Sequence, residues 1–405
     1  MFSSKLLFTK LSIKEKNKMK SMNIGNLEVK IPIVQGGMGV CVSLSGLSSA
    51  VANEGGIGVI SAVGIGHTEP DYRKNLKKAN AAALRKEIRK AKLNTDGIIG
   101  VNIMMAASDY DDLFNIAIEE KADVIFISAG LPLKKPAKTP ESVLQHTKTK
   151  LIPKVSSVRA GKLIFNHWSN KFNKVPDAIV IEGSLAGGHL GFKKAELEKD
   201  APLLSDITKE LVEVISVFEQ KYGKEIPVIA AGGIYSGGDM FNIMQAGAKG
   251  VKMGTRFVTT TECDASKEFK QAYLDCGQED IEIIDSPVGL PGRVISNNFV
   301  SKIKYGERKP VKCPWKCLKG CDFNEVPFCI AEALFNAANG NLDEGFVFAG
   351  ANAYKAKEIV SVRETFKQIE EEFYLEKIKF NEKIRTHTLN SFTGFQDRFL
   401  ASKTG

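Results

Sequence analysis

His189 is the residue whose surroundings most strongly suggest chemistry. It lies in VIEGSLAGGHLGF, residues 180–192, directly after the apolar run 177–181, which predicts a buried strand. Gly187 and Gly188 allow the backbone to turn sharply or to approach a ligand closely. An imidazole at such a strand end can titrate near neutral pH or donate a hydrogen bond to a bound group. A histidine in a flexible turn is the alternative interpretation, so the rest of the chain has to decide.

Glycine-rich segments follow other apolar runs as well. We call such a segment, where the chain leaves the end of a predicted strand, a strand exit. QGGMG begins at Gln35, AAGGI at Ala230 and KMGTRF at Lys252. Glycines at several strand ends let the backbone close on a flat or charged ligand from more than one side. We find no pair of carboxylates at strand ends and no G-x-S-x-G elbow, which disfavours hydrolytic chemistry.

The last two of these exits predict a phosphate site. Backbone N–H groups of Gly232, Gly233 and Gly254 could bind phosphate together with the Thr255 hydroxyl. Arg256 could add positive charge or pair with a surface acid. Tight turns without a ligand are the alternative, but two such exits in succession favour an organic cofactor that carries phosphate.

The elements that must position these residues alternate along the chain. Apolar runs occur at 30–35, 57–61, 98–103, 123–127, 151–155, 177–181, 227–231 and 250–253. Helical patterns lie between most of them, at 44–53, 71–91, 109–121, 158–169, 204–221 and 238–245. This alternation predicts an α/β fold, a (β/α)₈ TIM barrel with a C-terminal appendage over its mouth. A doubly wound open sheet is the alternative.

We divide the chain into four parts. Residues 1–21 are expected to be a loose N-terminal tail, 22–261 the cofactor-binding barrel, 262–378 a C-terminal lid with a cysteine cluster, and 379–405 a polar tail. Within the lid, 286–299 is rich in turn residues, and helices are predicted at 328–338 and 355–373.

Composition narrows the class of protein. The net charge is +9, but the lysines are scattered and no dense basic block is interleaved with aromatic residues, so nucleic acid is not an expected partner. No apolar run is long enough to span a bilayer, and the lysine-rich first twenty residues lack the features of a secretory signal. Seven cysteines, an odd number, argue against a disulfide scaffold and favour a cytoplasmic location.

Four of these cysteines form a cluster in CPWKCLKGCDFNEVPFC. Cys313, Cys317, Cys321 and Cys329 could hold zinc or an iron–sulfur cluster. Their spacing departs from the common C-x₂-C forms, and nearby prolines and glycine suggest bends. Buried free thiols are the alternative.

Seven motifs in order resemble the nitronate monooxygenase family, formerly the 2-nitropropane dioxygenase family, which includes flavin-type enoyl-acyl carrier protein reductases. The motifs are IPIVQGGMGV, GVNIM, IPKVSSVRAGK, VIEGSLAGGHLGF, IPVIAAGGI, GVKMGTRF and SPVGLPGR. They cover residues 31–299, and FAGANAY extends the resemblance more weakly.

The resemblance implies an FMN enzyme on a (β/α)₈ barrel, with His189 as the active-site histidine beside the flavin. It places Gly37 and Met38 nearest the isoalloxazine ring. The other cofactor contacts that it implies are Gly36, Gly39, Asn102, Lys162, Gly188, Gly232, Gly233, Met253, Gly254 and Thr255.

One departure from the family pattern concerns the residues before the two glycines. Leu185 and Ala186 stand where the family often has a glutamate and a small residue, so a carboxylate is missing. Glu182 could partly replace it or simply end the strand.

By resemblance, the expected activity is oxidation of alkyl nitronates with O₂ to carbonyl compounds and nitrite. The alternatives are an NAD(P)H-dependent reductase of enoyl thioesters and a non-catalytic flavin protein that acts as electron carrier or sensor. We expect a small-molecule substrate, and a homo-oligomer is compatible with the sequence.

Overall fold

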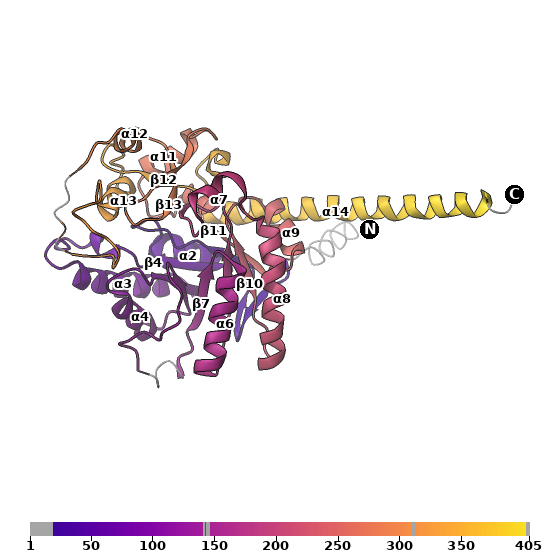
Figure 1. Ribbon diagram of the computed structural model, residues 1–405, viewed down its shortest axis with the longest axis horizontal. Helices are drawn as coiled ribbons and strands as arrows, with labels where there is room; N and C mark the ends of the chain where they lie inside the picture. The colour runs from indigo at the N-terminus through magenta and orange to yellow at the C-terminus, as the bar shows by residue number, and fades with distance from the viewer. Residues whose placement is uncertain (1–18, 141, 143–145, 310–312, 314, 402–405) are drawn as a thin grey trace, which may run out of the picture.

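The computed structural model describes residues 19–140, 142, 146–309, 313 and 315–401. Most of the predicted N-terminal tail, residues 1–18, lies outside this part of the chain. The centre of the molecule is a barrel surrounded by helices, and one long helix projects from it (Figure 1).

Eight parallel strands close the barrel in the order β10-β11-β3-β4-β5-β6-β7-β8. The predicted (β/α)₈ barrel is therefore confirmed, and the open doubly wound sheet is wrong. Closure depends on β11, which pairs with β10 through Lys252 opposite Ala231 and with β3 through Met253 opposite Gln35. The strands are β3 (Ile33–Gln35), β4 (Ile57–Ser61), β5 (Ile98–Met104), β6 (Val124–Ser128), β7 (Lys150–Val155), β8 (Ile179–Glu182), β10 (Val228–Ala231) and β11 (Gly250–Met253).

Helices follow the strands and form the outer ring (Figure 1). Their ends follow local sequence signals: Ser236 and Asp239 form a capping box at the start of α9, and Gly223 ends α8 with a φ of 61°. The ring contains α2 (Ser45–Asn53), the 3₁₀ turn η1 (Ile65–Thr68), α3 (Leu76–Asn94), α4 (Tyr110–Glu119), α6 (Val158–Phe172), α8 (Leu204–Tyr222), α9 (Gly237–Gln245) and α10 (Thr255–Val258).

A short hairpin covers the amino ends of the strands. It consists of β1 (Met22–Ile24) and β2 (Leu27–Val29), joined by a turn at Gly25. Ile24 and Val29 are fully buried in one cluster with barrel residues such as Phe126. This hairpin seals one end of the barrel, so ligands have access at the other end, where the strands exit.

The region after the barrel covers that other end with a small antiparallel sheet. β12 (Ile281–Asp285), β13 (Pro291–Ile295) and β14 (Val347–Phe348) pair in this order, and β9 (Gly188–His189) joins β13. The turn-rich interpretation of residues 286–299 missed β13. The helices of this region are α11 (Lys267–Asp275), α12 (Asn298–Lys304), α13 (Ile330–Ala338) and the 3₁₀ turn η2 (Ala353–Lys355), while the short helix α7 (Lys194–Lys199) lies earlier in the chain, between β9 and α8.

The last helix, α14 (Val362–Ala401), returns to the barrel and packs along α9. The Phe373 and Phe380 rings both contact Phe241 edge-on, and a side chain at Gly237 would collide with the Ile369 carbonyl. The helix continues without a break through residue 379, where the sequence predicted a tail to begin. The other domain boundaries remain predictions.

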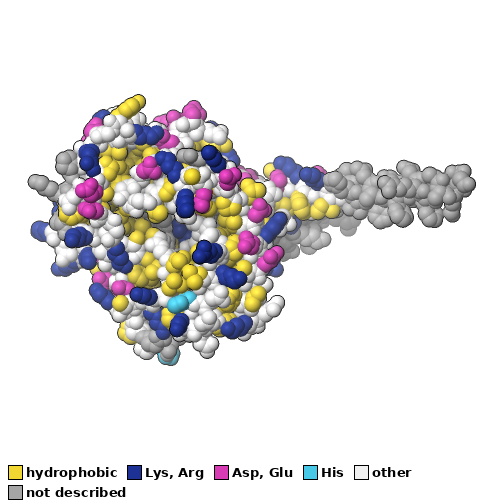
Figure 2. All heavy atoms as spheres, viewed as in Figure 1, with side chains coloured by type: hydrophobic (Ala, Val, Ile, Leu, Met, Phe, Trp, Pro, Cys, Tyr) yellow, Lys and Arg dark blue, Asp and Glu magenta, His cyan; other side chains and the backbone are white. Residues whose placement is uncertain are grey.

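Two surface properties bear on the class of protein. Lys and Arg side chains are scattered among Asp and Glu over the face in Figure 2, as expected for charge spread over a solvated surface. Among the described residues, we find no helix that combines the length and apolar character needed to cross a membrane.

We expect Phe373→Ala to lower the free energy of unfolding by about 3 kcal/mol, because a buried aromatic ring is replaced by a cavity. Ile378→Ala on the same helix, where the side chain is 50% exposed, should change it by no more than about 0.5 kcal/mol. Urea unfolding of both variants measures the difference. Equal effects would show that α14 is not held by this face.

Candidate active site

Three strand exits meet at the open end of the barrel at backbone distance. The Gly36 N–H donates to the Met253 carbonyl at 2.7 Å, and a Cβ on Gly36 would lie 3.0 Å from Gly254 Cα. A Cβ on Gly37 would lie 2.5 Å from Asn102 Cβ. These exits can approach one another only because Gly36, Gly37 and Gly254 lack side chains.

The rest of the first exit is fixed by its own hydrogen bonds. The Met38 N–H donates to Ser43 Oγ at 2.9 Å, and the Ser43 N–H donates to the Met38 carbonyl at 3.0 Å. Met38 is half-buried beside Gly254, and a side chain at Gly39 would collide with Val63. Met253 is 1% exposed, and its carbonyl already accepts from the Gly36 N–H, so this residue supports the first exit.

The exits of β10 and β11 carry the residues that the sequence predicted to form a phosphate cradle. Gly232 and Gly233 have φ values of +93° and +82°, the left-handed region that favours glycine. The Thr255 hydroxyl accepts from the Gly350 N–H at 3.0 Å, and Asn352 Nδ2 donates to the Gly233 carbonyl at 2.6 Å. The FAGANAY segment therefore crosses the cradle, a contact that sequence analysis did not assign.

Arg256 does not contribute its charge freely to this cradle. Its guanidinium donates to Gln368 at 2.8 Å, forms an ion pair with Glu372 at 3.5 Å and lies over the Tyr235 ring. Of the two interpretations of Arg256, the structure shows pairing with an acid, here on α14.

The residues at these exits fit a flat cofactor with a phosphate group. Glycine backbone lies at three of the exits, a half-buried methionine stands beside them, and a hydroxyl lies at the cradle. Asn102, which is 8% exposed, donates from Nδ2 to Ser128 Oγ at 3.2 Å. The oxygen of its side-chain amide, Oδ1, can act as an acceptor. Backbone amides and small polar groups of this kind orient a cofactor while leaving room for its ring.

His189 lies where the β8 exit joins the C-terminal sheet. Its backbone pairs with Gly292 of β13, its Nε2 lies 2.7 Å from Ser286 Oγ, and its ring contacts Phe348 edge-on at 4.9 Å. Burial, and to a lesser extent the charge of Lys154, lowers the pKa of His189 to about 4. The imidazole is therefore neutral at physiological pH and can act as a hydrogen-bond partner or a proton acceptor.

The loop that carries His189 is held in place by Arg293, which sequence analysis missed. Its guanidinium donates to the Ser184 carbonyl at 2.8 Å and also to the Ala186 carbonyl. The side chain is 7% exposed, and burial lowers its pKa. Arg293 is the last residue of the SPVGLPGR motif. Only the family resemblance of that motif could have drawn attention to it.

Two more missed residues place charge inside the mouth of the barrel. Lys154 at the end of β7 donates to both Glu182 oxygens, at 2.8 and 2.7 Å. Lys252 of β11 is 8% exposed, with its ammonium 4.1 Å from the centre of the Phe126 ring. A lysine inside an apolar strand run was the signal that could have identified both. Glu182 ends β8, as one of its two interpretations predicted, and its carboxylate binds Lys154.

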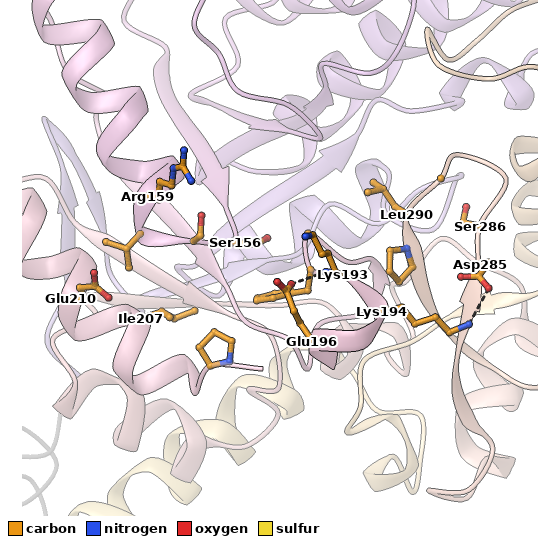
Figure 3. A pocket seen from close by; sticks show the side chains of 17 residues that line it. Ser156, Arg159, Lys193, Lys194, Glu196, Ile207, Glu210, Asp285, Ser286 and Leu290 are labelled. Carbon is orange, nitrogen blue, oxygen red and sulfur yellow. Dashed lines mark hydrogen bonds and ion pairs between the residues drawn. The ribbon is translucent and has the colours of Figure 1, made fainter. Parts of the chain in front are cut away.

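A cavity of about 970 Å³ lies beside Ser286, the hydrogen-bond partner of His189 (Figure 3). The start of α6, the segment around α7, α8 and residues 285–291 form its walls, and Ser286 connects it to the histidine. Arg159, Lys193 and Lys194 bring positive charge to the lining, while Glu196, Glu210 and Asp285 bring negative charge. Lys194 pairs with Asp285 at 2.9 Å, and the opposite charges of the lining largely balance.

Two other groups of predicted residues lie apart from the site. Lys162 is exposed on α6 and does not line this cavity. Cys313, Cys317, Cys321 and Cys329 surround a second cavity, but in the described chain no three His, Cys, Asp or Glu side chains are placed to hold a single metal ion. The structure thus gives no support to a mononuclear zinc site.

We expect Lys252→Met to change how stability depends on pH. Burial lowers the pKa of Lys252 from 10.5 to about 7, so between these values the residue is neutral when folded and protonated when unfolded. Unfolding then takes up a proton, and the free energy of unfolding rises with pH by up to about 1.4 kcal/mol per unit. Methionine removes this contribution.

The measurement is urea unfolding of wild type and Lys252→Met at pH 7, 8 and 9. The difference in free energy, wild type minus variant, should increase with pH. A difference that stays constant over this range would contradict the lowered pKa.

Comparison with known proteins assigns the family. The sequence model of the nitronate monooxygenase family matches residues 20–372. A probable nitronate monooxygenase of Staphylococcus saprophyticus is 28% identical over 323 residues, which cover 72% of this chain and 83% of that protein. The (3aS,4S,5R,7aS)-5-hydroxy-7a-methyl-1-oxo-octahydro-1H-indene-4-carboxyl-CoA dehydrogenase of Rhodococcus jostii is 28% identical over 277 residues, 68% of this chain and 66% of that protein.

The matched part thus spans just under two thirds of the dehydrogenase. Among solved structures, FabK from Thermotoga maritima superposes with a TM-score of 0.66 and 28% identity, over 89% of this chain and 96% of FabK. A family match over most of the chain, on a barrel whose exits fit a phosphate-bearing cofactor, leads to one conclusion: the chain belongs to the nitronate monooxygenase family of flavin-dependent oxidoreductases.

Proposed function

We propose that this chain binds FMN and oxidises an alkyl nitronate with O₂, giving a carbonyl compound and nitrite. The observation that carries the proposal is a neutral, half-buried histidine next to a lysine charge, at the edge of a glycine-lined cofactor site. The family match and the probable nitronate monooxygenase relative support the same activity.

The proposed cofactor is FMN because the cradle matches a single phosphate. Gly232 and Gly233 at one exit and Thr255 at the next are linked by the segment around Gly350 and Asn352, so their amides and hydroxyl could bind one phosphate together. The ring would lie toward Gly37 and Asn102, where the first and third exits meet. When bound, the flavin supplies the electron chemistry that no side chain of this site provides.

The side chains around this site provide charge and proton handling. Lys154 lowers the pKa of His189, which shows that its positive potential reaches the imidazole, and the same potential favours a bound anion such as a nitronate. Neutral His189 can accept a proton from the carbon of a nitroalkane or hydrogen-bond the substrate. Ser286 holds the ring through Nε2, and Phe348 shields one edge of it from water.

Reduction of an unsaturated acyl thioester with NAD(P)H is a second candidate. The cavity beside His189, at about 970 Å³, lies at the upper end of the range for drug-sized ligands and is much larger than a small nitronate needs. The Rhodococcus relative is named for a CoA thioester. In this reaction, the imidazole would polarise the thioester carbonyl.

Anaerobic flavin reduction separates the two candidates. We expect the purified protein to release FMN on denaturation, and its flavin to be reduced by propionate 3-nitronate but not by NADH or NADPH. Reduction by a nicotinamide cofactor, with reoxidation by an enoyl thioester, would replace the first candidate by the second. Release of FAD would overturn the cofactor assignment.

His189→Ala should retain the flavin and lose on the order of 10²- to 10⁴-fold in kcat/KM, because the cradle lies on other exits while the imidazole handles the proton. In wild type, His189 should cause no inflection in kcat/KM above about pH 5, since its pKa of about 4 leaves it neutral there.

The matched control is His167→Ala, a histidine on α6 that contacts Phe172. It should keep wild-type rates. His189→Asn tests whether a hydrogen bond alone is enough. Wild-type rates in both His189 variants, on a substrate shown to reduce the flavin, would remove His189 from the mechanism.

A further inference from the structure

Four cysteine side chains gather around one enclosed cavity in the C-terminal region. Cys313, Cys317, Cys321 and Cys329, all unpaired thiols, lie between α12 and α13. Each of them lines this cavity. The remaining lining is largely apolar and comes from Leu318, Phe323, Val326, Ile330 and Ala331, with Lys316 as the charged residue.

The four thiols are close enough to influence one another. Cys313 raises the pKa of each of the other three, and burial is the largest cause of the rise in each. The pKa of Cys317 is raised to about 12.

The backbone of this segment is irregular. Apart from an isolated bridge at Leu318, the described residues between α12 and α13 form neither helix nor strand, and Lys316 has a φ of 45°. A long segment of this kind inside a compact domain is usually functional. Regular structure therefore does not explain why four thiols converge here.

The barrel itself holds the segment in place. The Ser108 N–H donates to the Cys317 carbonyl at 3.0 Å, and the Lys319 N–H donates to the Ala106 carbonyl at 2.9 Å. Lys319 Nζ also donates to the Met105 carbonyl at 2.8 Å. These partners lie directly after β5, the strand that carries Asn102, so the cysteine cavity is anchored to an exit of the cofactor site.

The arrangement distinguishes between kinds of metal centre. The four thiols line one small cavity of about 10 Å³, which has room for about one water, and no three metal-binding side chains of the described chain are placed to hold one ion. A bound group of several atoms therefore requires these side chains to turn outward. A mononuclear zinc site needs ligands around a single point, whereas the cysteines of an iron–sulfur cluster are set around a group of several atoms.

We propose that Cys313, Cys317, Cys321 and Cys329 bind an iron–sulfur cluster, beside the β5 exit of the flavin site. Four thiolates complete the ligand set of either a [2Fe–2S] or a [4Fe–4S] cluster. The apolar wall limits access of water, and Lys316 offsets part of the negative charge.

The test uses full-length protein, purified without oxygen and with its flavin bound. We expect iron and acid-labile sulfide in equal amounts, about two or four of each per chain, and an electron paramagnetic resonance signal of a cluster after dithionite reduction. Cys317→Ser should lose at least half of the iron. Cys276→Ser, a buried cysteine that does not line this cavity, should keep all of it.

A measurement on wild type guards against misfolding of the variant. Anaerobic treatment with ferricyanide and a chelator should remove the iron and sulfide while the flavin stays bound. Folded, flavin-bound wild type with no iron, with zinc in stoichiometric amount, or with iron that Cys317→Ser retains would each overturn the proposal.

Discussion

The open end of this barrel depends on main chains that approach more closely than side chains allow. Gly36 lies against Gly254, and Gly37 lies against Asn102, at distances where a Cβ would collide. These two contacts set the relative heights of the β3, β5 and β11 exits. The flat site between the exits, and the positions of the groups around it, follow from that spacing, and any side chain at Gly36 or Gly37 would push the exits apart.

Charge inside the mouth is the second constraint. A lysine paired with Glu182 and another lysine over the Phe126 ring lie in a largely apolar interior, where an unpaired ion is costly. Burial is the main cause of the low pKa values of both Lys252 and His189, and Lys154 contributes to each. The site thus keeps one fixed ion pair and two groups that give up their protons easily.

The barrel could be predicted well from the sequence because two signals are local: the alternation of apolar runs with helical patterns, and the placement of glycines after those runs. All eight apolar runs became strands of the closed barrel within a few residues, and the glycine-rich exits lie together as expected. Sequence analysis missed β13 because Pro291 and Gly292 read as a turn, and it missed Lys154 and Lys252 because a single lysine usually indicates exposure. The ion pair of Arg256 with Glu372 joins residues more than a hundred positions apart, which no local pattern reveals.

That ion pair has a consequence for the order of assembly. Glu372 of α14 also accepts from the Gly237 N–H, so one carboxylate connects the first turn of α9 with α10, the two helices that follow the phosphate cradle. Gly350 and Asn352 reach the cradle from nearly as late in the chain. The predicted cradle lies mainly before residue 256, but its supports lie about a hundred residues further along the chain. During synthesis, the barrel strands can form while these supports have not yet been made, so the flavin can be held firmly only after α14 has joined the barrel.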